Sequence, residues 1–175
     1  MSVDEVIRYV KTPEQARDYL NHLKVPLAEE YLKPEYNKRF SSRAKISNTF
    51  KNVHDSGKAV CLGHALSAAA LLKDDGYSPV LMFLDGEGFS ANHIVYPYKK
   101  NGKLGALGTT SLKPKFDSLS ELKNELIKKY PEQKPEKYWI ADLDKSFPDE
   151  KWIYGYENLF PTPLESANIF FFSER

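Results

Sequence analysis

Cys61-Leu-Gly-His64-Ala-Leu-Ser-Ala-Ala-Ala-Leu-Leu-Lys73 is the stretch of this chain that decides its fold. Its leucines and alanines make a helix that is apolar nearly all round, which is typical of a helix buried in the middle of a domain. Gly76 suits the end of that helix, and residues 78–84 then have the composition of a short buried strand. The stretch therefore predicts a central helix that leads into a β-sheet.

Cys61 is the only cysteine in the 175 residues, and it begins this helix. The first turn of a helix leaves backbone N–H groups unpaired, and the helix dipole favours a thiolate over a thiol. His93 opens the segment 93–98, whose alternation is typical of a strand. An imidazole on a neighbouring strand can exchange the proton that acyl transfer needs, so Cys61 and His93 are the candidate catalytic pair.

The rest of the chain predicts the elements around this centre. Ser2 and Thr12 have N-cap spacing and open two short amphipathic helices. Before the central helix, we expect short helices and loops over 26–56. After it, we expect a loop over 85–88 that gates the site, then strands over 93–98 and 103–109 joined by an Asn-Gly turn. The rest of the chain predicts a helix over 118–130, a connector over 131–135, and strands over 138–141, 152–154 and 169–172. This order indicates an α+β fold rather than alternating βαβ units.

The spacing of Cys61, the alanine-rich helix, the strand after it and the His93 hairpin resembles that of the transglutaminase-like (papain-like) cysteine enzyme superfamily. The resemblance covers about residues 44–111. It implies one domain over 1–175, in which N-terminal helices and a central Cys-bearing helix pack on an antiparallel sheet, with α/β additions towards the C-terminus. It also implies that Cys61 is a nucleophile and His93 its proton partner.

Two positions depart from the pattern of that superfamily. Ala59 stands where the family usually has a glycine, two residues before the cysteine. Gly108 stands where the family has the aspartate that orients the histidine, and glycine has no side chain for that task. The residues that remain open as a substitute third member or as pocket residues are polar: Thr109, Thr110, Asn92, His64, Asp142 and Asp144.

Other interpretations of the same residues stay open. Cys61 is also compatible with a small buried hydrophobe, and His93 with a core histidine. Together with His54 and His93, the pair Cys61-x-x-His64 leaves open a zinc site, although only that pair has close ligand spacing. His64 is better explained as a structural or pocket-lining residue than as a metal ligand.

The charges exclude no fold but disfavour some partners. Lys and Arg number 25 against 24 Asp and Glu, so no global field predicts a nucleic-acid partner or an anionic membrane. The single cysteine fits a reducing compartment, and no signal peptide or apolar run of about 20 residues is visible. We expect a cytoplasmic protein, and the oligomeric state stays open.

The resemblance to the transglutaminase-like superfamily implies a cysteine enzyme that hydrolyses or transfers an amide or acyl bond of a peptide or protein substrate. The predicted reaction needs no metal or organic cofactor. The alternative is a transglutaminase-like domain that has lost its chemistry, for which Gly108 is the reason, and that binds a peptide or protein instead.

Overall fold

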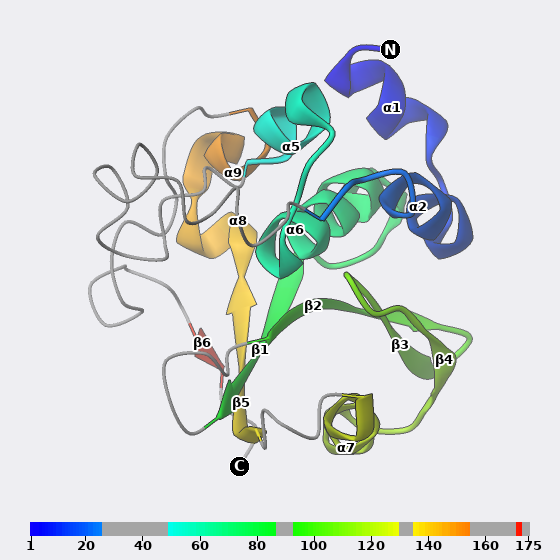
Figure 1. The fold of residues 1–175 in the computed structure, drawn as a ribbon, viewed down its shortest axis with the longest axis vertical. Helices are drawn as coiled ribbons and strands as arrows, with labels where there is room; N and C mark the ends of the chain where they lie inside the picture. Colours follow the sequence, from blue (N-terminus) through cyan, green and yellow to red (C-terminus); the bar gives the residue numbers. More distant parts are fainter. Residues whose placement is uncertain (26–48, 87–92, 130–134, 155–170, 173–175) are drawn as a thin grey trace.

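The computed structural model of the 175-residue chain describes residues 1–25, 49–86, 93–129, 135–154 and 171–172. In this part of the chain one antiparallel sheet has the strand order β4-β3-β2-β1-β5-β6, with helices on both of its faces (Figure 1). The central helix α6 (Cys61–Leu72) packs on β2 (His93–Lys100) and β1 (Val80–Gly86). The predicted α+β fold, with a Cys-bearing helix on an antiparallel sheet, is confirmed.

The remaining elements frame this centre. Before α6 come α1 (Val3–Tyr9), α2 (Pro13–Leu20) and α5 (Phe50–Ser56); after it come the turn η2 (Lys73–Asp75), β3 (Lys103–Leu107), β4 (Leu112–Phe116), α7 (Leu119–Lys129), β5 (Pro135–Asp142), α8 (Leu143–Ser146), the turn η3 (Pro148–Glu150), α9 (Lys151–Tyr154) and β6 (Phe171–Phe172). Helices α1, α2, α5 and α9 surround α6 on one face of the sheet, and α7 covers the other face (Figure 1).

Alternation along the strands separates the two apolar layers. Phe83 and Ile94 are opposite each other on β1 and β2 and belong to the core around α6. Met82 and Val95 form the neighbouring pair and belong to the core under α7. Every residue of α6 from 63 to 72 is buried, because the helix has apolar neighbours on all sides.

The predicted helix starts and the predicted hairpin are confirmed. Ser2 Oγ accepts the Glu5 N–H at 3.3 Å while the Glu5 carboxylate accepts the Ser2 N–H, which is a complete capping box. Thr12 caps α2 in a similar way. Between β2 and β3, Asn101 has φ 52° and Gly102 has φ 80°. Positive φ at both central positions defines a type I′ turn, whose twist matches that of the strands.

Two sequence-based predictions need correction. Residues 152–154 form the helix α9 rather than a strand. Trp152 and Ile153 are fully buried there, and so short an apolar run fits one helical turn as well as a strand. Asp85 and Gly86 belong to β1, where they pair with β5, so the predicted loop cannot begin at Asp85.

Several predictions lie wholly or partly outside the described residues. These are the segments 26–48, 87–92 (which includes Asn92), 130–134 and 169–170. Of the predicted C-terminal strand, Phe171–Phe172 is described, and it lies at the edge of the sheet next to β5.

Candidate active site

Cys61 is the first residue of α6, and its side chain is half-buried. The N-cap residue Val60 has an extended backbone and no side chain that can accept a hydrogen bond from the first turn. The backbone N–H groups of Leu62 and of Cys61 itself lower the pKa of the thiol, by less than burial raises it.

A third backbone N–H reaches the same sulfur from β2. The two-residue turn makes Lys100–Lys103 the first hydrogen-bonded pair of the β2–β3 hairpin, and such pairs recur at every second residue. Tyr96–Leu107 is therefore a bonded pair, and Ile94–Thr109 would be the next. Because β3 ends at Leu107, the Ile94 N–H is directed at Cys61 Sγ instead. The thiol lies at the edge of β2 where β3 ends.

His93 precedes Ile94 and is the first residue of β2, opposite Leu84 of β1. Its side chain is 5% exposed, and this burial lowers its pKa to about 4. The imidazole is therefore uncharged at neutral pH. The structure brings the Ile94 backbone close to the Cys61 sulfur. His93 lies opposite Leu84, which belongs to the core under α7, so its side chain is on the face of the sheet away from α6 and Cys61.

The protonation state of Cys61 differs from the expectation of a thiolate. Burial raises the pKa of the thiol, and this effect is larger than the opposite effects of the Ile94 and Leu62 N–H groups. In the resting protein both the thiol and the imidazole of His93 are uncharged. The helix N-terminus alone suggests a thiolate, but desolvation of the sulfur outweighs it.

Gly108 is buried and lies beside the β2 residues that follow His93. A Cβ atom at Gly108 would meet Val95 Cγ1 and the Ile94 carbonyl oxygen at 3.5 Å each, which is ordinary van der Waals contact. Such a side chain would therefore lie on the Val95 face of the sheet, and alternation places His93 on that same face. The space beside His93 where a third catalytic side chain would stand holds a glycine.

The proposed substitutes for that third side chain have different surroundings. Thr109 is exposed and Thr110 is half-buried, both in the bend after β3. Asp142 accepts the Lys145 N–H at 3.1 Å as the N-cap of α8, at the end of β5. Asp144 follows it and is exposed. The two aspartates therefore lie on the β5 side of the sheet rather than at the end of β3.

His64 lies one turn after Cys61 and is 4% exposed. Its Nδ1 atom lies 3.1 Å from the carbonyl oxygen of Val60, so Nδ1 carries the proton and donates it to that oxygen. Burial lowers the pKa of His64. Within the ranges that the structure describes, no group of three or more His, Cys, Asp or Glu residues is arranged to hold a metal ion.

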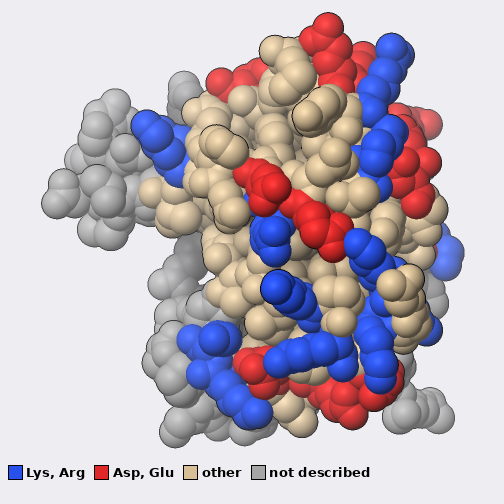
Figure 2. All heavy atoms as spheres, turned by 90° about the vertical axis from the view of Figure 1, so that its right-hand side faces the viewer, with Lys and Arg blue, Asp and Glu red and all other residues tan. Residues whose placement is uncertain are grey.

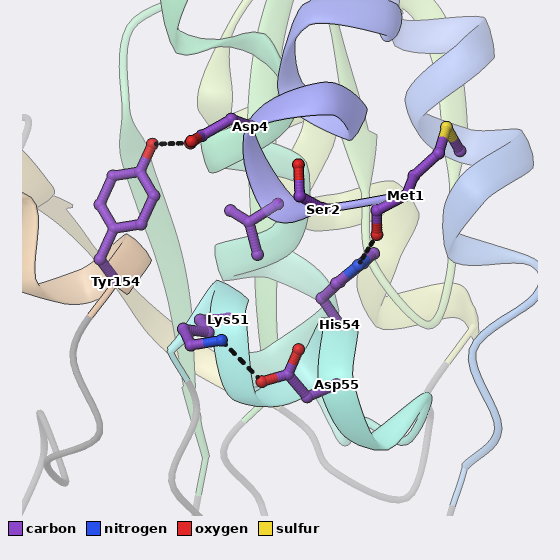
Figure 3. Close-up of a pocket in the computed structure, with 8 residues that line it drawn as sticks. Met1, Ser2, Asp4, Lys51, His54, Asp55 and Tyr154 are labelled. Carbon is purple, nitrogen blue, oxygen red and sulfur yellow. Dashed lines mark hydrogen bonds and ion pairs between the residues drawn. The ribbon is translucent and has the colours of Figure 1, made fainter.

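A hollow of about 290 Å³ lies elsewhere, where the start of α1 meets α5 and α9 (Figure 3). The polar groups that line it pair with one another: His54 Nε2 donates to the Met1 carbonyl oxygen at 2.9 Å, Tyr154 Oη donates to Asp4 Oδ1 at 2.8 Å, and Lys51 pairs with Asp55 at 2.9 Å. None of the predicted catalytic residues lines it. Its contacts join the N-terminal helix to the rest of the fold.

Sequence reasoning missed the Ile94 N–H, because a backbone donor has no residue-type signature. A signal nevertheless exists in the hairpin. The Asn101–Gly102 turn fixes which residues of β2 have their N–H groups on the β3 side, and Ile94 is one of them. Counting from the turn therefore identifies the donor once the end of β3 is known.

No protein-family model matches the chain, and no curated protein matches its sequence. Among the described residues, no helix has both the length and the apolar composition that crossing a bilayer requires.

Proposed function

We propose that the protein is a transglutaminase-like cysteine enzyme that hydrolyses or transfers an amide or acyl bond of a peptide or protein substrate. Cys61 is the nucleophile in this proposal, and His93 is its proton partner. The observation that supports it most is that backbone N–H groups from two elements, Ile94 of β2 and Leu62 of α6, lie close enough to one sulfur to lower the pKa of its thiol. Fixed donors of this kind stabilise negative charge that develops on the sulfur during proton loss.

The pKa values define how the proton moves in this proposal. A pKa of about 4 leaves His93 unprotonated at neutral pH. To accept the thiol proton as Cys61 attacks the substrate carbonyl, the imidazole at the start of β2 must turn from the α7 face towards Cys61. The carbonyl oxygen becomes an oxyanion, which in this proposal accepts a hydrogen bond from the Cys61 N–H at the helix start. His93 then returns the proton to the leaving amine, and a thioester forms on Cys61. Water or a second amine releases the acyl group.

The test is acylation of Cys61 by an activated acyl donor. With p-nitrophenyl acetate, we expect a burst of p-nitrophenolate and one acetyl group on Cys61 in the intact mass spectrum. Cys61→Ala removes the burst, and His93→Ala slows it by roughly 10²-fold or more, because a positioned acid–base group contributes that much. His22→Ala is the matched control, since His22 is exposed after α2 and should leave the rate unchanged.

Gly108 favours a second candidate function, a degenerate domain that binds a peptide without turning it over. Acetylation of Cys61 at equal rates in the native protein and in His93→Ala would support this candidate and sink the enzyme proposal. Gly108→Asp separates the two further, because the structure has room for its Cβ on the His93 face. If Cys61 is acylated only in the Gly108→Asp variant, the native protein has the arrangement of the site without its catalytic activity, which supports the degenerate domain.

A further inference from the structure

Positive charge is concentrated in one part of a chain whose total charge is nearly balanced. Residues 88–116 contain five lysines and no aspartate or glutamate. The five are Lys99, Lys100, Lys103, Lys113 and Lys115, named here the hairpin lysines, and all of them lie on β2, β3 and β4. The fold therefore gathers these charges on one end of the sheet.

The hairpin lysines are open to solvent. Lys100 is half-buried and the other four are exposed. Lys100 lies directly opposite Lys103 across the β2–β3 pair, and Lys113 and Lys115 alternate outwards on the edge strand β4. Figure 2 faces this side of the molecule and shows basic side chains gathered over its lower half, above a band of acidic ones. Lys100 and Lys103 lie on the α2 side of the sheet, and Lys99, opposite Leu104, lies on the α7 side, so the basic charges surround this end of the sheet on both faces.

The acidic groups next to this surface balance it only in part. Lys100 pairs with Glu14 of α2 at 2.7 Å, Lys103 pairs with Asp117, and Lys115 approaches Glu125 of α7 at 3.9 Å. Exposed ion pairs of this kind contribute little free energy, so carboxylates of a partner can replace them. Lys113 makes no ion pair with any other residue that the structure describes.

We propose that the hairpin lysines dock an acidic stretch of a polypeptide partner. Lysine rather than arginine makes up the whole surface, and arginine is the residue that suits bidentate phosphate binding. The aromatic rings of these strands, Tyr96, Tyr98 and Phe116, are buried and offer no platform on which bases stack. Clustered carboxylates are the partner chemistry that this surface complements.

The edge strand β4 indicates that docking uses side chains. Pro114 lies between Lys113 and Lys115 and has no N–H, which weakens the edge as a template for strand addition. Lys99, Lys100 and Lys103 flank the turn, Lys113 and Lys115 lie on the edge strand β4, and Cys61 lies close to Ile94 at the end of β2 away from the turn. Docking is therefore independent of whether Cys61 performs chemistry.

Lysines and a proline on an edge strand also protect a sheet from aggregation, and that explanation predicts no specific binding. Fluorescence anisotropy with a fluorescein-labelled poly-glutamate peptide distinguishes the two. We expect saturable binding that weakens with added salt. The double variant Lys99→Glu/Lys113→Glu should bind about tenfold more weakly, since a tenfold change corresponds to about 1.4 kcal/mol.

The control is Lys24→Glu/Lys151→Glu, which changes the net charge equally at two exposed lysines outside the hairpin. It should keep the native affinity within about twofold, a change of less than 1 kcal/mol. Circular dichroism checks that both double variants fold. If Lys99→Glu/Lys113→Glu does not fold, Lys99→Gln/Lys113→Gln takes its place. Absent binding, equal losses in both double variants, or displacement of the peptide by a lower concentration of oligothymidylate would each overturn the proposal.

Discussion

At Cys61, the same position that supplies N–H donors also removes the sulfur from water. The donors lower the pKa of the thiol and burial raises it, and burial is the larger effect. The thiol is therefore protonated at rest and needs a base at the moment of attack. Burial keeps His93 neutral, and we expect it to act as that base once its imidazole turns from the α7 face towards the sulfur.

The low pKa of His93 has a consequence for stability. Its pKa is about 4 in the fold against an ordinary value near 6.5, so the unfolded chain binds more protons between these values. The free energy of unfolding should therefore fall as the pH decreases from about 6.5 to about 4. A shift of this size corresponds to about 3 kcal/mol. Urea unfolding near both ends of that pH range measures the fall.

In His93→Gln the fall should be smaller than in the native protein by about that 3 kcal/mol, because glutamine does not titrate. His22→Gln replaces an exposed histidine and should retain the native fall. An equal pH dependence in His93→Gln and the native protein would mean that His93 is not a buried neutral base.

At the scale of elements, the glycine inside β3 and the glycine just after it have different surroundings. A Cβ at Gly105 would lie 2.6 Å from Tyr98 Cζ and 2.8 Å from the Leu112 carbonyl oxygen. Both distances are shorter than a van der Waals contact, so the surrounding atoms would have to move. At Gly108, just after the strand, the nearest contacts are 3.5 Å. Gly105 therefore lets three strands pack around the Tyr98 ring, whereas Gly108 leaves space unused.

Gly105→Ala should lower the free energy of unfolding by about 1–3 kcal/mol, because backbone and ring must both shift. Gly108→Ala is the matched control and should stay within about 0.5 kcal/mol of the native protein. Urea denaturation of both variants gives the comparison. Equal stabilities would show that β3 and β4 move apart at little cost.

At the scale of the whole molecule, His54 of α5 connects segments that are distant in the sequence. Its Nε2 donates to the Met1 carbonyl oxygen, so Nδ1 is unprotonated and accepts from Tyr19 Oη at 2.9 Å. Tyr19 belongs to α2, and burial, with a smaller effect of Asp55, raises its pKa to about 12. One imidazole thus joins α5 to both ends of the N-terminal helical region.

A double-mutant cycle with His54→Ala and Tyr19→Phe should give a coupling free energy of about 1 kcal/mol, the size of one hydrogen bond. Thermal or urea unfolding of the four proteins measures it. In the control cycle, Tyr98→Phe replaces Tyr19→Phe. The Tyr98 hydroxyl bonds the Leu112 carbonyl oxygen, so its effect should add to that of His54→Ala. If the effects in the first cycle are additive, the hydrogen bond between His54 and Tyr19 does not stabilise the contact between α5 and α2.

Local sequence patterns correctly predicted the features that are stabilised by interactions between residues close together in the sequence. Ser2 and Thr12 cap their helices, and Asn101–Gly102 forms the predicted turn, because capping and turn geometry involve residues a few positions apart. Trp152 shows where such patterns fail. Its short apolar run has no period of its own, and in the fold it forms a buried helical turn that packs against α5 and α6.

The sequence by itself determined the α+β order, the helix that begins at Cys61 and the strand that begins at His93, because these follow from apolar periodicity and turn chemistry. Only the tertiary structure decided that the Ile94 N–H is directed at the Cys61 sulfur and that both catalytic candidates are uncharged at rest. Protonation depends on burial and on donors from distant segments, and neither is encoded near the residue that titrates.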